Sequence, residues 1–351
     1  MKAFDLVREN LKNFKAYDTS IMGEKILLNA NENPYLASED FESPYNRYPE
    51  SQPKFLLHSL SKAYKAKEEQ IVITSGGDQA IDLIIRCFIN EGESVIITPP
   101  TFVMYQFYTE VQGGKVIKVP LMEQNNYQLN VAEIIKQQEI TKAKVVFLVN
   151  PSAPLGHEIH KDDILYLLKA LKDKAIVVVD EAYIEFSEVE SFMSKIDEFD
   201  NLMIIRTLSK YYGFAGLRLG ALIANHEIAE IIRAIMPPYS LSMPAIKVAE
   251  GVFGSEKLLS QAKENAGNIL KTKKVLEDAL ELFPYVKKVF KTKTNYVFII
   301  VDNGDDFKKH CFENEILVRS FESQIKGGVR ISIGSDLENE ILIRTMKNYK
   351  K

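Results

Sequence analysis

The chain has 351 residues, of which 46% are hydrophobic and 26% are charged; this balance excludes a disordered chain and predicts about two globular domains. Its 44 Lys and Arg residues against 48 Asp and Glu residues give a net charge of −4, which argues against nucleic-acid binding. The N-terminus lacks the apolar core of a signal peptide, no apolar run is long enough to cross a bilayer, and only two cysteines occur. We therefore expect a cytoplasmic protein that contacts neither membrane nor nucleic acid.

From about residue 70 onward, short β-branched segments alternate with helical ones. The pattern predicts strands over residues 71–74, 94–98, 144–149, 176–179 and 202–205, and helices over 79–89, 131–138 and 162–171. Strands that are apolar on both faces and separated by helices favour a mostly parallel sheet sandwiched by helices, an α/β fold. Ligands of such sheets gather at the carboxyl ends of the strands.

The pattern changes after Pro237-Pro238. Helical periodicity runs over residues 244–283 with a break near Gly254, and then a strand (296–301), a helix (306–314), short strands (316–318 and 329–333) and a closing helix follow. We expect a large domain over residues 35–240 and a smaller α+β domain built from residues 1–34 and 241–351. Residues 1–34 are assigned to the small domain because they precede the alternating pattern.

The segment with the most chemical content directly follows an expected strand. It reads Thr207-Leu-Ser-Lys210-Tyr-Tyr-Gly213-Phe-Ala-Gly216-Leu-Arg218-Leu-Gly220. Its glycines allow sharp turns and close backbone approach. Ser209 and Arg218 are suited to a phosphate, and the Lys210 amine is suited to attack an aldehyde, so an anionic aldehyde cofactor fits the segment. A glycine-bearing loop with a solvated lysine is the alternative.

Asp180 lies at the end of another expected strand, in the segment Asp180-Glu-Ala-Tyr183. Burial of its carboxylate is costly unless a cation or several hydrogen-bond donors face it. A protonated pyridine nitrogen is one such partner, because an aspartate beside it makes the ring a better electron sink. An aspartate that caps the next helix is the alternative.

Two further turns follow strands. In Asn150-Pro-Ser-Ala-Pro-Leu-Gly156, two prolines and a glycine make a rigid turn that can orient the Asn150 amide. In Thr74-Ser-Gly-Gly77-Asp78-Gln79, backbone N–H groups at the start of a helix can bind an anion. Taken alone, the first turn is better explained as a plain connection between a strand and a helix, and the second is weak evidence for an anion site.

The order of these four motifs resembles the fold type I aminotransferases that use pyridoxal 5′-phosphate. The segments Leu28-Asn-Ala-Asn31-Glu-Asn-Pro34, Arg47-Tyr48-Pro49 and Asp180-Glu-Ala-Tyr183 resemble the histidinol-phosphate aminotransferase branch, and the similarity extends to Arg330-Ile-Ser-Ile-Gly334. The resemblance implies an aspartate aminotransferase-like fold, a homodimer, and pyridoxal 5′-phosphate as cofactor. It also implies transamination between L-histidinol phosphate and 2-oxoglutarate in histidine biosynthesis, giving imidazole acetol phosphate and L-glutamate.

The resemblance further implies roles for single residues around the cofactor. Lys210 would hold the cofactor and move the proton at the reacting carbon, with Asp180 and Tyr183 as its catalytic partners. Asp180 would pair with the ring nitrogen, while Asn150 and Tyr183 would bond the phenolic oxygen. Phe102 would stack on the ring. The cofactor phosphate would be bound by Gly77, Asp78, Gln79, Ser209 and Arg218, and by Tyr48 from the partner subunit.

Substrate anions would be bound by a second set of residues. Arg330 would take the α-carboxylate of glutamate, and Arg319 its side-chain carboxylate or the phosphate of histidinol phosphate. Tyr17 would help to bind that phosphate, and Asn31 would also contact substrate. A guanidinium can bind either anion through paired hydrogen bonds.

The chain departs from the family pattern at two places. The family commonly reads Asn-Pro-Asn-Asn-Pro-Thr-Gly where this chain has Ser152, Ala153 and Leu155, and Phe102 replaces a more usual tyrosine. An aromatic amino-acid aminotransferase, a phospho-amino-acid decarboxylase and a cofactor-binding regulatory protein without turnover stay open as alternatives. We expect no metal site, because the HEIH segment lacks further ligands nearby.

Overall fold

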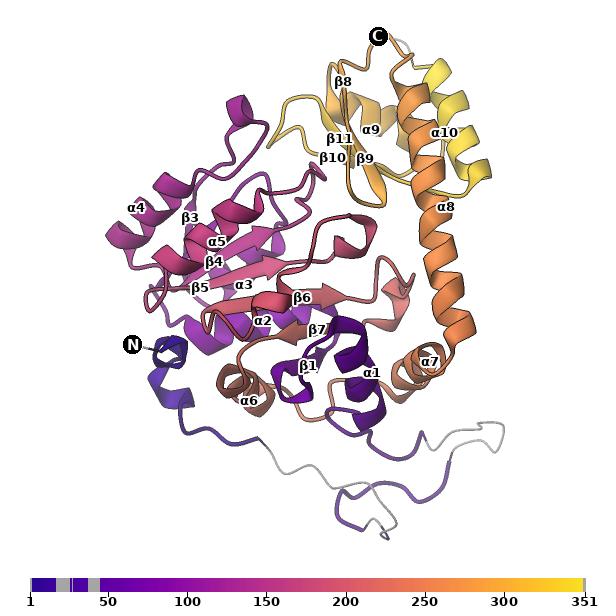
Figure 1. Ribbon diagram of the computed structural model, residues 1–351. Coiled ribbons are helices and arrows are strands. Elements are labelled where there is room, and N and C mark those ends of the chain that lie inside the picture. The colour runs from indigo at the N-terminus through magenta and orange to yellow at the C-terminus, as the bar shows by residue number, and fades with distance from the viewer. Residues whose placement is uncertain (1, 17–25, 27, 37–44, 350–351) are drawn as a thin grey trace.

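The computed structural model describes residues 2–16, 26, 28–36 and 45–349. A seven-stranded sheet forms the centre of the large domain (Figure 1). Its order is β1-β7-β6-β5-β4-β2-β3, and only β7 runs antiparallel to its neighbours. This arrangement confirms the mostly parallel α/β sheet. The strands are β1 (Ile71–Thr74), β2 (Ser94–Ile97), β3 (Lys115–Lys118), β4 (Val145–Val149), β5 (Ile176–Asp180), β6 (Leu202–Thr207) and β7 (Gly220–Ile223).

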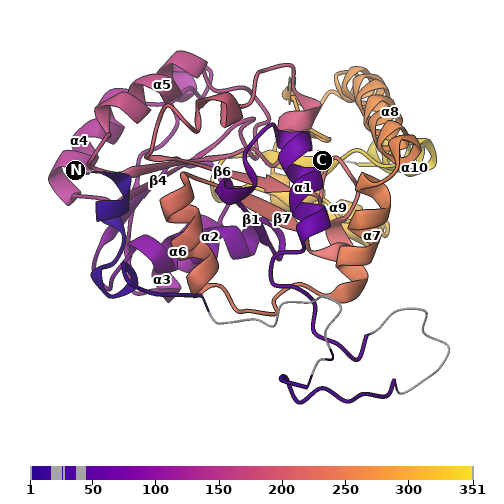
Figure 2. The ribbon, with the colours of Figure 1, turned by 60° about the horizontal axis from the view of Figure 1, so that its bottom comes forward.

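Helices cover both faces of this sheet (Figure 2). One face carries α2 (Gly76–Phe88), α3 (Met104–Val111) and α6 (His226–Ile235), and the opposite face carries α4 (Val131–Thr141) and α5 (Lys161–Ala170). Helix α4 begins as a capped helix should, because the Asn130 side chain accepts a hydrogen bond from the Glu133 N–H at 3.2 Å. Helix α1 (Lys54–Tyr64) packs against α7 (Met243–Phe253).

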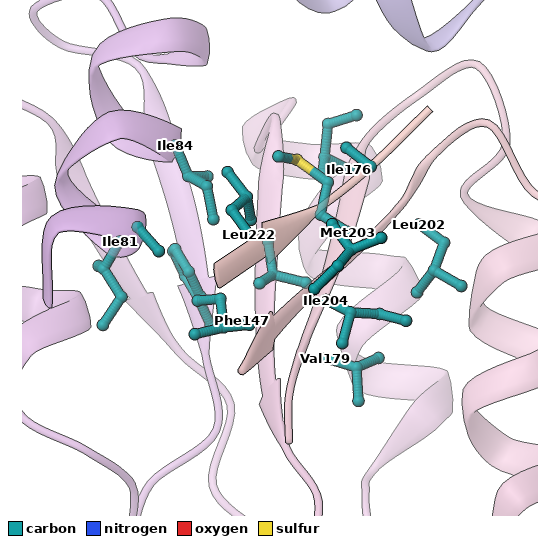
Figure 3. Packing of buried hydrophobic residues seen from close by; sticks show 14 of the residues in the cluster. Ile81, Ile84, Phe147, Ile176, Val179, Leu202, Met203, Ile204 and Leu222 are labelled. Carbon is teal, nitrogen blue, oxygen red and sulfur yellow. The ribbon is translucent and has the colours of Figure 1, made fainter. Parts of the chain in front are cut away.

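The core of the large domain lies between α2 and the sheet and continues on the other side of it. Ile81 and Ile84 of α2 point toward Phe147 and Leu222 of the sheet, and all four side chains are fully buried (Figure 3). Each such side chain stabilises the fold by about 1.5–3 kcal/mol relative to exposure. The strand ends that carry the expected chemistry are thereby held on a rigid support.

The small domain has its own antiparallel sheet, in the order β10-β11-β9-β8. Its strands are β8 (Lys288–Phe290), β9 (Tyr296–Ile300), β10 (Arg319–Ser320) and β11 (Gly328–Ser332), and its helices are α8 (Glu256–Leu280), α9 (Gly304–Glu313) and α10 (Asp336–Lys347). A separate apolar cluster that includes Leu276, Val297 and Phe307 fills its interior. The long α8 runs from α7 into this domain (Figure 1). The short strand expected over residues 316–318 is wrong, because the ladder to β11 forms at Arg319–Ser320.

The N-terminal segment differs from its expected assignment to the small domain. Ala3, Leu6 and Leu11 are buried in the core of the large domain. The Arg8 N–H also donates a hydrogen bond to the Cys87 carbonyl at 3.0 Å, at the end of α2. The described residues 2–16 therefore belong to the large domain, because position before the alternating pattern says nothing about where apolar side chains pack. In the described part of the chain, no helix is long and apolar enough to cross a membrane.

Candidate active site

A cavity of about 200 Å³ lies at the carboxyl ends of β4, β5 and β6, beside the start of α2. Arg330, on β11, brings the small domain into its lining. The cavity is therefore at the place where ligands of a parallel sheet bind and where the two domains meet. Its lining residues are Gly77, Asp78, Ile81, Phe102, Tyr105, Val149, Ala153, Asp180, Ala182, Tyr183, Ile205, Thr207, Ser209, Lys210, Ala215, Arg218 and Arg330.

Asp180 is a buried carboxylate that faces this cavity. Its Oδ2 accepts a hydrogen bond from the Tyr105 hydroxyl at 2.6 Å, and its Oδ1 accepts one from the Ala182 N–H at 3.0 Å. Burial raises the pKa of Asp180 to about 6, although both hydrogen bonds act in the opposite direction. Within the described residues it forms no ion pair. A cationic group of a ligand in the cavity would therefore be stabilised by Asp180.

Lys210 follows β6, and its Nζ lies 5.9 Å from the centre of the Tyr183 ring. Burial lowers the pKa of Lys210, and the positive charges of Arg330 and Arg218 lower it further. A lowered pKa leaves more of the amine neutral near pH 7. The neutral amine is the form that attacks a carbonyl and accepts a proton.

The other end of the cavity is built to receive an anion. Arg218 places Nη2 3.1 Å from the Asp78 carboxylate, and its Nη1 donates to the Ala215 carbonyl at 3.2 Å. Gly76 has φ +77°, and a Cβ there would lie 2.8 Å from Arg218 Nη2. Glycine thus allows the guanidinium to approach the first turn of α2, whose N–H groups have no partners within the helix. Ser209 also lines the cavity.

Arg330 reaches the cavity from the small domain, and its guanidinium lies over two aromatic rings. Its Cζ lies 5.2 Å from the centre of the Tyr296 ring and 5.6 Å from the centre of the Phe321 ring. No carboxylate or carbonyl among the described residues pairs with its guanidinium. Its N–H donors therefore remain available for a ligand.

Comparison with known proteins identifies the family. Residues 23–346 match the family model described as aminotransferase class I and II. A histidinol-phosphate aminotransferase of Idiomarina loihiensis is 35% identical, over 98% of this chain and 98% of the relative. The chain belongs to this aminotransferase family.

Solved structures agree with the assignment. The histidinol-phosphate aminotransferase from Clostridium acetobutylicum covers 86% of this aminotransferase with a TM-score of 0.76 and 26% identity, over 90% of its own chain. The enzyme from Sinorhizobium meliloti, in complex with pyridoxal 5′-phosphate, covers 86% with a TM-score of 0.77, over 83% of its own chain. At 20% identity, the second similarity shows the fold alone. The fold type I architecture that the sequence resemblance implied is confirmed.

Most of the residues singled out from the sequence line the cavity of the aminotransferase. They are Gly77, Asp78, Phe102, Asp180, Tyr183, Ser209, Lys210, Arg218 and Arg330. They come from five separate segments, and all but Arg330 lie close to strand ends or to the start of a helix. Their individual roles toward cofactor and substrate stay predictions.

Two predicted cofactor ligands use their side chains to brace turns. Asn150 is buried, and its Oδ1 accepts a hydrogen bond from the Ile159 N–H at 2.9 Å, which holds the turn after β4. Gln79 accepts a hydrogen bond from the Ser75 N–H at 2.6 Å and so holds the turn before α2. Neither residue lines the cavity.

Three further predicted residues lie elsewhere in the described part of the chain. Tyr48 is exposed and stacks on Tyr239, with the ring centres 4.2 Å apart. Arg319 lies opposite Arg330 in the β10–β11 ladder but is exposed and does not line the cavity. Asn31 is exposed and has φ +53°. Tyr17 lies outside the described residues.

Sequence reasoning missed Tyr105, which holds Asp180. Tyr105 follows Phe102 by three residues, and the two rings meet edge to face with their centres 5.8 Å apart, but no sequence motif connects Tyr105 to Asp180. Sequence reasoning also missed Tyr296 and Phe321, which contact Arg330 from the small domain. No local motif marks these two, because only the fold brings them to the site. Among the described residues, no group of three or more His, Cys, Asp or Glu side chains could hold a metal ion.

Proposed function

We propose that the protein transfers an amino group between L-histidinol phosphate and 2-oxoglutarate, with pyridoxal 5′-phosphate as cofactor, and so acts in histidine biosynthesis. The observation that carries the proposal is the meeting of Lys210, Asp180 and Arg218 in one cavity of an aminotransferase chain. The choice of substrate is supported by a relative of 35% identity that is named a histidinol-phosphate aminotransferase and matches almost the full length.

The residues present fit the proposed cofactor at both of its ends. Arg218, Ser209 and the first turn of α2 offer positive charge and N–H donors to a phosphate, in a space kept open by Gly76. Asp180 offers a buried carboxylate with no ion-pair partner among the described residues, and a protonated ring nitrogen would supply the missing charge. Phe102 lines the cavity and offers an aromatic face.

The remaining chemistry would be carried out by side chains of this protein. When bound, pyridoxal 5′-phosphate supplies an electron sink for the carbon that loses a proton. The neutral amine of Lys210 would accept the proton from the substrate α-carbon, because its lowered pKa leaves it available as a base. Asp180, whose carboxylate is held by the Tyr105 hydroxyl, would pair with the ring nitrogen and favour its protonated form. The ring of Tyr183 packs beside Lys210 and limits where its amine can move.

Arg330 would bind the α-carboxylate of glutamate, and Arg319 on the neighbouring strand would bind its side-chain carboxylate or the phosphate of histidinol phosphate. Tyr17 would help to bind that phosphate, and Asn31 would also contact substrate. Because a guanidinium can donate paired hydrogen bonds to either anion, one site would serve two unlike substrates in turn.

A homodimer in the cytoplasm is part of the same proposal. Tyr48 does not line the cavity of its own chain and is exposed beside Tyr239, as expected of a side chain donated to a partner subunit. Cys87 and Cys311 are both free and buried, as is typical of a reducing compartment.

The test mixes the purified, cofactor-loaded protein with L-histidinol phosphate in the absence of any oxo acid and follows the visible absorption band of the cofactor. L-Phenylalanine and O-phospho-L-threonine serve as parallel samples. We expect the band to disappear fastest with histidinol phosphate and to return when 2-oxoglutarate is added. Faster loss with phenylalanine would indicate an aromatic aminotransferase, and release of CO₂ from O-phosphothreonine would indicate a decarboxylase. A protein that acquires no visible band with the cofactor would overturn the proposal.

A further inference from the structure

We propose that Tyr296 and Phe321 act as positioning residues that hold Arg330 between two aromatic faces and leave its hydrogen-bond donors open for the substrate anion. The inference rests on the proposed function, because it concerns how the substrate anion is bound. We name this arrangement the aromatic clamp, and it consists of the rings of Tyr296 and Phe321. Neither residue belongs to the motifs that the sequence singled out.

Arg330 lies close to the rings of both Tyr296 and Phe321. Both ring centres lie within 6 Å of its Cζ, at 5.2 Å for Tyr296 and 5.6 Å for Phe321, which is the range of a cation–π contact. Such a contact attracts the positive charge through the ring face and occupies no N–H donor. All five donors of the guanidinium therefore remain for a carboxylate or a phosphate.

Two other arginines, Arg218 in the cavity and Arg206 on the far side of the sheet, are held differently. Nη1 of Arg206 pairs with Glu181 at 2.7 Å, and its Nη2 pairs with Glu185 at 3.1 Å. Nη2 of Arg218 pairs with Asp78, and its Nη1 donates a hydrogen bond to the Ala215 carbonyl. Arg330 is held without any such pair among the described residues, so binding an anion there breaks no existing ion pair.

The two rings are themselves firmly held. Tyr296 is 2% exposed, its hydroxyl donates to the Ser152 carbonyl at 3.0 Å, and its ring meets that of Tyr183 edge to face with the centres 5.3 Å apart. Phe321 is 8% exposed and belongs to a small apolar cluster with Leu155 and Phe298. Because the two rings are already fixed, they lose little conformational entropy when Arg330 binds an anion.

The clamp is connected to the turn after β4, where the chain departs from the pattern of the family it resembles. Ser152 accepts the hydrogen bond from Tyr296, and Leu155 is fully buried against the cluster that holds Phe321. Gly156 has φ +74°, and a Cβ there would lie 2.5 Å from the Thr292 Cβ, so only glycine allows this approach. The turn of the large domain thus contacts both members of the clamp, Tyr296 through a hydrogen bond and Phe321 through the cluster that contains Leu155.

The test compares three substitutions in the cofactor-loaded protein. Phe321→Leu removes one face of the clamp and keeps an apolar side chain. Phe321→Tyr keeps the face. Phe290→Leu is the matched control, because Phe290 packs against the same cluster and carries its own cation–π contact, to Lys288 at 4.3 Å.

The primary measurement is calorimetric binding of glutarate, which has the two carboxylates of glutamate and cannot react. Loss of one cation–π contact is expected to weaken glutarate binding by about three- to tenfold in Phe321→Leu. The KM for glutamate should rise by a similar factor, with kcat within about twofold of the unmodified enzyme. Phe290→Leu should bind like the unmodified enzyme, and Phe321→Tyr should restore most of the affinity. Thermal unfolding confirms that each variant is folded.

Three outcomes would overturn the inference. They are equal binding by Phe321→Leu and Phe290→Leu, no rescue by Phe321→Tyr, and no glutarate binding by the unmodified enzyme. Failure of the proposed function has a different signature. In that case histidinol phosphate and glutamate leave the cofactor band unchanged, whereas glutarate binding still follows the clamp.

Discussion

Two consecutive carboxylates at the end of β5 lie on opposite sides of the sheet, and only one of them is paired with a cation among the described residues. Asp180 faces the cavity and accepts hydrogen bonds from Tyr105 and Ala182, with no cation paired to it among the described residues. Glu181 is fully buried on the other side, 2.7 Å from Nη1 of Arg206. Side chains alternate along a strand, so neighbours in sequence are directed to different environments.

The difference separates a carboxylate whose charge is compensated within the protein from one that faces an open cavity. The Glu181 carboxylate also accepts hydrogen bonds from Ser191 and from the Phe192 N–H, so its charge is compensated inside the protein. Asp180 has two hydrogen bonds and an open cavity, and burial raises its pKa to about 6. A buried charge without a cation lowers stability. Such an unpaired charge is typical of a functional site, where a bound ligand supplies the opposite charge. The comparison predicts that changes on the cavity side affect chemistry and changes on the far side affect folding.

Lys210→Ala should give the largest effect on the cavity side. In the proposed function it removes both the attacking amine and the group that would move the proton, so turnover with histidinol phosphate should fall by at least about a thousandfold. The thermal midpoint should not fall, because a buried amine with a lowered pKa is removed. Steady-state rates and thermal unfolding of the same preparation check both statements. Turnover that persists in pure Lys210→Ala protein supplied with fresh cofactor would exclude Lys210 from the reaction.

Glu181→Gln tests the far side of the sheet. Removal of one partner of a buried ion pair leaves Arg206 partly uncompensated, and the free energy of unfolding should drop by about 3 kcal/mol or more. Turnover per folded molecule should stay within about twofold, because Glu181 does not line the cavity. Urea unfolding and kcat are the measurements, with Asp180→Asn alongside. The separation of the two faces fails if Glu181→Gln slows turnover as much as Asp180→Asn does.

The pH dependence of the cofactor-free protein sharpens the comparison further. The pKa of Asp180 is about 6 when folded and about 3.9 when unfolded, so between these values the folded state keeps a proton that the unfolded state has lost. The contribution of Asp180 to stability therefore decreases as pH rises from about 4 to 6, by up to about 3 kcal/mol. Asp180→Asn should remove this decrease, so that its stability relative to the unmodified chain rises across the window. The measurement is the free energy of unfolding of both proteins between pH 4 and pH 6. A difference between them that does not change with pH would contradict the raised pKa of Asp180.

Most of the large domain could be predicted because its strands are apolar on both faces. The two strands that were missed lack this pattern. Lys115–Lys118 is an edge strand with exposed charges at both ends, and Gly220–Ile223 begins with glycine and alanine, which disfavour strands. The N-terminal residues were misplaced because they pack through tertiary contacts that no local period reveals.

The candidate site also contains residues that local motifs predict and residues that only the packing of the fold brings there. Its strand-end residues could be read from local motifs, since each stands beside a glycine turn or a buried strand. Tyr105 could not, because it reaches Asp180 across 75 residues of sequence, and the bond of Tyr296 to Ser152 spans 144. Both depend on how the elements pack, which is set by the whole core and not by any short segment.

Tyr105→Phe is expected to have the smallest effect, and it tests whether Asp180 depends on its neighbour. The substitution keeps the ring, which stacks on Phe147 with the centres 4.5 Å apart, and removes only the hydroxyl that donates to Asp180 at 2.6 Å. The pKa of Asp180 should rise further, since one of its two hydrogen bonds is lost, and kcat should fall by about tenfold or less.

Tyr285→Phe is the matched control, because its hydroxyl donates to the Met346 carbonyl at 2.7 Å within the small domain. The control should lose similar stability, about 1 kcal/mol, without any change in kcat. If both variants lower kcat equally, the loss reflects stability alone; if only Tyr105→Phe does, the hydroxyl acts through the carboxylate that it holds.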